Sequence, residues 1–144
     1  MPLFVDTDLL VYARDSSDRS KHARATAWMA HLWTSGDGRV STQVLHEYYV
    51  AVTRKLRPGL NRDVARSDVE DLMTWNPSPM DGRTLAVGFA VEERFGLSFW
   101  DSLVVASAQI AGCERLLTED LQDGAVYDSV TVTNPFVLDP AELT

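Results

Sequence analysis

The segment Leu3-Phe4-Val5-Asp6-Thr7-Asp8, at the start of the chain, decides the fold. Its three apolar residues are typical of a short buried strand, which the acidic and hydroxyl residues then end. Further strand candidates lie at 39–41, 114–118 and 129–132, and longer segments with helical patterns lie between them. Short strands that alternate with helices predict an α/β fold, with a mostly parallel central β-sheet flanked by α-helices.

Capping residues mark the ends of the predicted helices. Ser, Thr, Asp or Asn precedes most of the helical patterns, and Gly36 and Gly96 follow two of them. We expect helices at 9–13, from Asp18 to the Ser35-Gly36 turn, and at 42–56, 61–75, 81–95 and 98–112. Residues 76–80 contain two prolines and form at best an edge strand.

Length and composition narrow the class of protein. The 144 residues fit one domain, 1–144, and no stretch is apolar enough to span a membrane. The only cysteine, Cys113, cannot form an internal disulfide, and the first residues do not resemble a signal peptide. We therefore expect a cytoplasmic protein.

The net charge of −8 argues against nucleic-acid binding through a general surplus of Lys and Arg. If the chain handles RNA, its affinity must come from a local basic patch and from bound cations. An acidic surface also suits a basic protein partner.

Two aspartates stand directly after strand candidates. Asp6 follows the first apolar run, and Asp120 follows Leu116-Leu117-Thr118 with one residue between. Ligand sites of open α/β sheets lie outside the carboxyl ends of the strands, so these carboxylates can share one crevice. Alternatively, each of them caps the helix or turn that follows it.

Asp101 lies on an apolar helical face. Val104, Val105 and Ala108 follow it at helical spacing, which predicts a carboxylate inside an apolar stripe. Burial of a lone carboxylate costs roughly several kcal/mol, and a metal ion would offset that cost. The alternative is a capping box with Ser98, which would leave the charge in the crevice.

Glu47 lies beside the apolar face of the 42–56 helix and by itself reads as a boundary residue. Glu47 becomes a candidate site residue only in combination with Asp6, Asp101 and Asp120. Four gathered carboxylates repel one another unless a cation binds them, and Mg²⁺ or Mn²⁺ prefers such oxygen ligands. Either ion stabilises the charge that develops on a phosphate, so phosphodiester hydrolysis fits this set of residues.

Four segments resemble the PIN-domain nucleases, in particular the VapC toxins of bacterial toxin–antitoxin pairs. They occur in the order and with the spacing of the family and cover nearly the whole chain. The matching segments are 4–13 (FVDTDLLVYA), 41–49 (STQVLHEYY), 97–103 (LSFWDSL) and 116–124 (LLTEDLQDG). The resemblance implies a single PIN domain, a four-acid magnesium site that cuts RNA, a cognate antitoxin that silences it, and a homodimer.

The resemblance also implies roles for individual residues. Asp6 and Asp101 correspond to the principal metal ligands, and Glu47 and Asp120 to further ligands or to groups that orient water. Two hydroxyl residues, Thr7 and Thr118, correspond to positions that hydrogen-bond the carboxylates.

The chain departs from the family pattern at Asp8, where an asparagine is usual. This fifth carboxylate either strengthens a second metal site or caps the first helix, and we expect the cap. Asp123 is a further acid beside the fourth segment, and we expect Asp120 rather than Asp123 to face the metal. Candidate phosphate-binding residues are Arg14, Lys55, Arg83 and Arg94, each of which alternatively is a solvated surface residue.

Two other functions are compatible with parts of the pattern. A phosphatase of the haloacid dehalogenase type also has an apolar strand followed by Asp-x-Asp, but neither lysine, Lys21 or Lys55, stands after a suitable strand. A catalytically silent interaction module would use the acidic crevice only to receive a basic peptide. The presence of all four acids argues against it.

Overall fold

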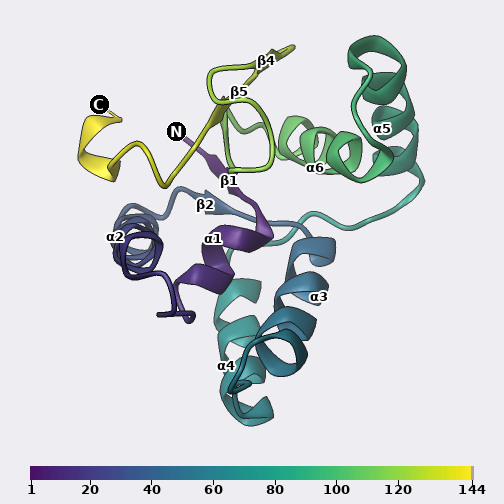
Figure 1. Cartoon of the computed structure of the whole chain (residues 1–144). Helices are drawn as coiled ribbons and strands as arrows, with labels where there is room; N and C mark the ends of the chain where they lie inside the picture. Colours follow the sequence, from purple (N-terminus) through teal and green to yellow (C-terminus); the bar gives the residue numbers. More distant parts are fainter. Residues whose placement is uncertain (144) are drawn as a thin grey trace.

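The computed structural model describes residues 1–143, so Thr144, the last residue of the expected domain, lies outside the described part (Figure 1). The strands are β1 (Leu3–Val5), β2 (Gly38–Arg39), β3 (Arg115–Leu117), β4 (Val126–Tyr127) and β5 (Val130–Thr133). The helices are α1 (Thr7–Tyr12), α2 (Arg19–Ser35), α3 (Thr42–Val50), the π-helix η1 (Ala51–Lys55), α4 (Arg62–Met73), α5 (Gly82–Phe95), α6 (Phe99–Ile110) and the 3₁₀ helix η2 (Pro140–Glu142).

The five strands form one sheet in the order β2-β1-β3-β5-β4. β1 runs parallel to β2 and β3, and β3 runs parallel to β5. Only β4, a two-residue strand that the sequence did not predict, pairs antiparallel at the edge. The mostly parallel α/β sheet expected from the sequence is therefore confirmed.

The connections place a crevice between β1 and β3. The chain leaves β1 toward β2 on one side, and it leaves β3 toward β5 on the other. Right-handed crossovers then put α2 on one face of the sheet and α6 on the opposite face, as Figure 1 shows. Such a reversal of strand order is where open α/β sheets bind ligands, outside the carboxyl ends of the strands.

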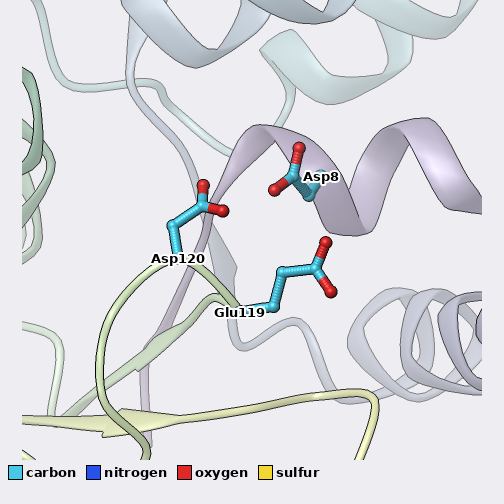
Figure 2. A group of neighbouring side chains, drawn as sticks. All are labelled: Asp8, Glu119 and Asp120. Carbon is cyan, nitrogen blue, oxygen red and sulfur yellow. The ribbon is translucent and has the colours of Figure 1, made fainter.

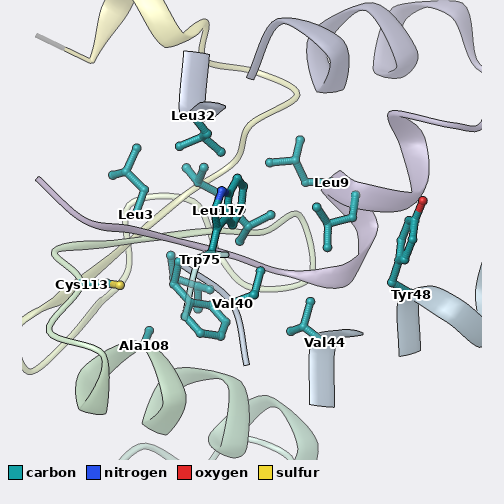
Figure 3. Packing of buried hydrophobic residues seen from close by; sticks show 14 of the residues in the cluster. Leu3, Leu9, Leu32, Val40, Val44, Tyr48, Trp75, Ala108, Cys113 and Leu117 are labelled. Carbon is teal, nitrogen blue, oxygen red and sulfur yellow. The ribbon is translucent and has the colours of Figure 1, made fainter. Parts of the chain in front are cut away.

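A single apolar core holds these strand ends in place (Figure 3). All three residues of β1 are buried, as parallel strands covered on both faces require. The indole of Trp28 in α2 donates hydrogen bonds to the carbonyls of Pro135 and Leu138, at 2.8 and 3.0 Å, and so fixes the C-terminal segment. A Cβ on Gly38 would lie 2.6 Å from the ring of Trp75, which explains the glycine in β2.

Most helix caps are as predicted, and Asp18, Asn61, Asp81 and Ser98 each cap a helix. The 42–56 helix differs, because Ser41 caps it instead of Thr42. The Oγ of Ser41 accepts from the amide of Val44, whereas the hydroxyl of Thr42 accepts from the amide of Met80. This helix also widens into the π-helix η1 over its last turn. Residues 76–80 contribute only one bridge, between Ser41 and Ser78.

No helix within residues 1–143 has the length and apolar character needed to cross a membrane.

Candidate active site

A cleft of about 720 Å³ opens at the carboxyl ends of β1 and β3, beside α1 and the α3–η1 helix. Its walls carry four carboxylates, one cationic side chain and the exposed ring of Trp100. The acids are Asp6, Asp8, Glu47 and Asp120, and the cation is Lys55.

Asp6 is the buried acid of the cleft, with only 8% of its surface exposed. It is the N-cap of α1, and its Oδ1 accepts from the amide of Thr7 at 2.8 Å. Its Oδ2 accepts from the hydroxyl of Thr118 at 2.8 Å. Burial raises the pKa of Asp6 to about 6 despite these hydrogen bonds, and the nearby charges of Asp120 and Glu47 add to the rise. The cap and the crevice site, which the sequence left as alternatives, are therefore combined in one residue.

Glu47 is exposed but held in place through both carboxylate oxygens. The hydroxyl of Thr7 donates to Oε2 at 2.8 Å, and the amide of Gln43, one helical turn earlier, donates to Oε1 at 2.8 Å. Thr7 and Thr118 therefore make the hydrogen bonds to carboxylates that the resemblance implied. Gln43 was not singled out in the sequence, although its i, i+4 spacing from Glu47 is a usable signal.

Asp8, Glu119 and Asp120 point toward one another (Figure 2). One carboxylate oxygen from each lies within 4.8 Å of the others. Burial and the negative charge of Asp120 raise the pKa of Asp8 well above the usual range of an aspartate. The expectation that Asp8 caps the first helix is wrong, because Asp6 occupies the cap and Asp8 faces the cleft from the first turn of the helix.

Glu119 is the acid that the sequence analysis missed, although it lies beside Asp120 at the end of a strand. The Nζ of Lys21 forms an ion pair with its carboxylate at 2.8 Å. The same Nζ lies 5.0 and 5.4 Å from the ring centroids of Tyr12 and Phe136. Glu119 thus already has a cationic partner from the protein.

The structure distinguishes Asp120 from Asp123. Asp120 lines the cleft, and its amide donates to the hydroxyl of Thr118 at 3.1 Å. Asp123 instead accepts from the amide of Asn134 at 2.9 Å and so holds the segment that follows β5. Of the two, Asp120 is the acid that lines the cleft, and its role toward a metal stays a prediction.

Asp101 lies apart from the cleft acids: within residues 1–143, no hydrogen bond or ion pair joins it to any of them. It is half-buried in the first turn of α6, and its amide donates to the Oγ of Ser98 at 3.1 Å. Its neighbour Trp100 lines the cleft, but Asp101 is not among the lining residues. The buried acid is Asp6 rather than Asp101, because Asp101 stands in the first turn of α6, before the fully buried residues of that helix begin.

Comparison with known proteins identifies the family. The family model described as PIN domain matches residues 3–123. The chain belongs to the PIN-domain family. This confirms the resemblance drawn from the four sequence segments and favours it over the haloacid dehalogenase alternative. A comparison with curated proteins found no match.

Solved PIN-fold structures extend the likeness over nearly the whole chain. FitAcB from Neisseria gonorrhoeae superposes with a TM-score of 0.69 at 20% identity and covers 94% of this chain and 99% of its own. A toxin–antitoxin complex from Klebsiella pneumoniae gives 0.63 at 20% identity, with 94% and 98% covered. VapC20 of Mycobacterium tuberculosis, described as a sarcin–ricin loop cleaving toxin, gives 0.59 at 17% identity, with 82% and 89% covered. At sequence identities of 17–20%, this structural similarity shows a shared fold only.

The basic residues proposed for RNA binding divide into two groups in this PIN domain. Arg14 forms an ion pair with Asp68 at 2.6 Å, and Arg94 pairs with Asp128. Lys55 lines the cleft, and Arg83 lies exposed at the start of α5. The ion pairs leave Arg14 and Arg94 poorly suited to hold a phosphate.

The donor set of the PIN cleft fits a hard divalent cation. Several carboxylate oxygens from separate chain segments meet at one edge, and Asp6 and Asp8 already have raised pKa values. A cation of this kind would relieve the repulsion between them. The coarse function that follows is that of a nuclease family whose site can bind divalent metal ions.

Proposed function

We propose that the protein is a magnesium-dependent endoribonuclease that hydrolyses RNA phosphodiester bonds and acts as the toxin of a cytoplasmic toxin–antitoxin pair. The observation that carries the proposal is the convergence of Asp6, Glu47 and Asp120 in one cleft at the switch point of a PIN-fold sheet. Oxygen ligands of this kind select Mg²⁺ or Mn²⁺ over softer metals.

The side chains of the cleft would divide the work of holding the cation. Asp6 is the fixed ligand, because Thr7 and Thr118 determine the direction of its oxygens. Glu47 and Asp120 come from separate segments of the cleft wall, and they complete the set or orient a water molecule. When bound, the cation supplies charge neutralisation for the phosphate and a lower pKa for attacking water.

Asp101 remains the proposed fourth ligand. It is adjacent in sequence to Trp100 at the edge of the cleft, and the first turn of α6 puts its carboxylate near the helix N-terminus. Replacement of Asp101 by Asn is expected to reduce cleavage together with the affinity for Mg²⁺. Full activity of Asp101→Asn would remove this residue from the site.

The proposed partner is a cognate antitoxin that binds a homodimer of this chain. Support comes from the PIN-fold neighbours, which include a toxin–antitoxin complex and a FitAB complex bound to DNA. The acidic cleft would accept a basic side chain such as an arginine from the antitoxin, because its four carboxylates share the single cationic side chain of Lys55. An antitoxin complex that leaves the cleft open and active would contradict this part of the proposal.

The test is cleavage of RNA by the purified protein in Mg²⁺, with and without EDTA, compared with Asp6→Asn. Asparagine keeps the size of Asp6 but removes its charge and replaces one of its two acceptor oxygens with an NH2 group, which can only donate. We expect activity to fall by at least about a hundredfold, more than the roughly 10- to 100-fold decrease typical when a group that supports a metal ligand is removed.

Asp123→Asn is the matched control, because Asp123 lies three residues from Asp120 but binds the backbone of Asn134. It is expected to cleave like the wild type. Wild-type protein that leaves RNA intact in Mg²⁺, or equal activity of Asp6→Asn, overturns the proposal.

A further inference from the structure

Cationic side chains concentrate in one segment of this acidic protein. Residues 54–66 contain five cationic residues and a single acid, Asp63, whereas the chain as a whole carries a net charge of −8. The five are Arg54, Lys55, Arg57, Arg62 and Arg66. Local charge of this kind is the basic patch that an acidic RNA-binding protein requires.

Three of these arginines line one small pocket. Arg54, Arg62 and Arg66 border a hollow of about 180 Å³, together with Tyr49 and Thr53. None of the three forms an ion pair with a carboxylate anywhere in residues 1–143, in contrast to Arg14, Arg24 and Arg94. Three like charges without a counterion repel one another, and a bound anion would remove that repulsion.

The local backbone presents these side chains in different directions. Arg54 and Lys55 are consecutive in η1, where Arg54 borders the arginine pocket and Lys55 borders the acidic cleft. The loop after η1 folds back onto it, since the amide of Leu60 donates to the carbonyl of Val52 at 2.8 Å. A Cβ on Gly59 would lie 2.6 Å from the carbonyl oxygen of Thr53, so only glycine fits there without a shift. The pocket is therefore supported by packed backbone.

An apolar groove of about 460 Å³ lies between the arginine pocket and the acidic cleft. It shares His46 and Val50 with the cleft, and it shares Tyr49 and Arg66 with the pocket. The three hollows therefore follow one another across α3. A single strand of RNA has this alternation of properties, with phosphates that need cations and unstacked bases that lie on apolar and aromatic surfaces.

We infer that the arginine pocket of Arg54, Arg62 and Arg66 binds a backbone phosphate of the RNA strand, one or more nucleotides away from the bond held in the acidic cleft. The inference rests on the proposed ribonuclease function and adds a substrate-binding site to it. The size of the pocket suits one anionic group, since it is below the roughly 300 to 1,000 Å³ typical of sites for drug-sized ligands.

The test compares short and long RNA. Fluorescence anisotropy measures the binding of single strands of about four and about twelve nucleotides, which spans common site sizes for single-stranded nucleic acid. The proteins are Arg62→Gln/Arg66→Gln and its parent, both in the Asp6→Asn background with Mg²⁺. The matched control is Arg19→Gln/Arg94→Gln, which removes the same charge from α2 and α5.

The parent is expected to bind the long strand more tightly than the short one, and Arg62→Gln/Arg66→Gln is expected to abolish this preference. The slope of log affinity against log salt for the long strand should become shallower by about 0.7 for each phosphate that the variant no longer neutralises. In cleavage assays without Asp6→Asn, the KM for long RNA rises while kcat for short RNA stays unchanged. The control keeps the length preference.

Two results overturn the inference: an unchanged length preference in Arg62→Gln/Arg66→Gln, or an equal decrease of that preference in the control pair. Neither result would refute the proposal that the wild type cleaves RNA. Conversely, a wild type that fails to cleave RNA, but whose length preference disappears in Arg62→Gln/Arg66→Gln, supports the phosphate site and refutes the ribonuclease proposal.

Discussion

Two carboxylates on opposite sides of the α1–α3 helix pair, Asp68 of α4 and Glu47 of α3, have opposite kinds of partner. Asp68 accepts two hydrogen bonds from the guanidinium of Arg14, at 2.9 and 2.6 Å, and a third from the hydroxyl of Tyr48 at 2.5 Å. Glu47, the residue before Tyr48, faces the cleft with neutral donors only. The protein thus neutralises Asp68 internally, while most of the cleft acids are left for a cation from solution.

The pKa values reflect the same contrast. The hydrogen bond to Asp68 raises the pKa of Arg14, and burial together with Asp68 raises the pKa of Tyr48, so both keep their protons. In the cleft, burial raises the pKa of Asp6 to about 6, because the protein supplies no full positive charge to it. Carboxylates without a full positive charge beside them therefore mark the side of the helix pair that faces the cleft.

Among changes that leave every cleft acid in place, the largest effect is expected from removal of the hydroxyl that orients Asp6. Thr118→Val keeps the shape of the side chain but deletes the 2.8 Å hydrogen bond to Oδ2 of Asp6 and the acceptor for the amide of Asp120. Activity should fall by about 10- to 100-fold, as for other groups that support a metal ligand. Steady-state cleavage assays at several Mg²⁺ concentrations measure this decrease, and Thr118→Ser should restore most of the activity. Equal activities of Thr118→Val and the wild type would show that neither the orientation of Asp6 nor the contact with the Asp120 amide matters for cleavage.

The next effect concerns the pH dependence of stability without metal. The folded-state pKa values of Asp6 and Asp8 are raised, so folding favours their protonated forms. Their stabilising contribution is complete below the unfolded pKa of about 4 and disappears as pH rises through about 6 and above. In EDTA, the Tm should therefore fall between about pH 5 and about pH 7.5, and the fall should be smaller in Asp8→Asn.

Addition of Mg²⁺ at the higher pH should reverse the fall in the wild type, since a ligand that binds only the folded state raises its stability. Differential scanning fluorimetry provides the melting temperatures. A Tm that rises over this pH range in EDTA, or the same profile for Asp8→Asn and the wild type, would contradict the assignment of Asp8 to the cleft.

The smallest effect is expected on the other side of the helix pair. Arg14→Gln removes an ion pair whose arginine side chain is 43% exposed, so the free energy of unfolding should fall by at most about 1 kcal/mol. RNA cleavage and its Mg²⁺ dependence should remain as in the wild type. Urea denaturation and the same cleavage assay test both points. A large decrease in cleavage with intact stability would return Arg14 to the candidate phosphate-binding residues.

The fold was predictable because local signals agree with one another. The apolar run before Asp6, the capping residues such as Asp81, and the glycines at 36 and 96 each act over a few residues. The widening of the helix end into η1 was not predicted from the sequence; the loop after it donates from the amide of Leu60 to the carbonyl of Val52, a contact that no local pattern indicates. β4 was missed because a strand of two residues is too short to show the alternation of apolar and polar residues that predicts a strand.

The candidate site was predictable where an acid follows a strand, as for Asp6 and Asp120. The orientation of Asp8 was not, since both a cap and a cleft position are possible for a residue at the start of a helix. Glu119 and its ion pair with Lys21 depend on the approach of α2 to the loop after β3, which is a tertiary contact. The arginine pocket joins residues from η1 and α4, whose relative placement the sequence does not reveal.

Calorimetric titration with Mn²⁺ tests the central claim most directly, because it measures whether the cleft acids hold a divalent cation independently of any RNA substrate. We predict binding to the wild type and to Asp123→Asn, and absent or strongly weakened binding in Asp6→Asn and Asp120→Asn. Absence of binding to the wild type, or equal affinities in all four proteins, would contradict the assignment of this cleft as a metal-dependent active site.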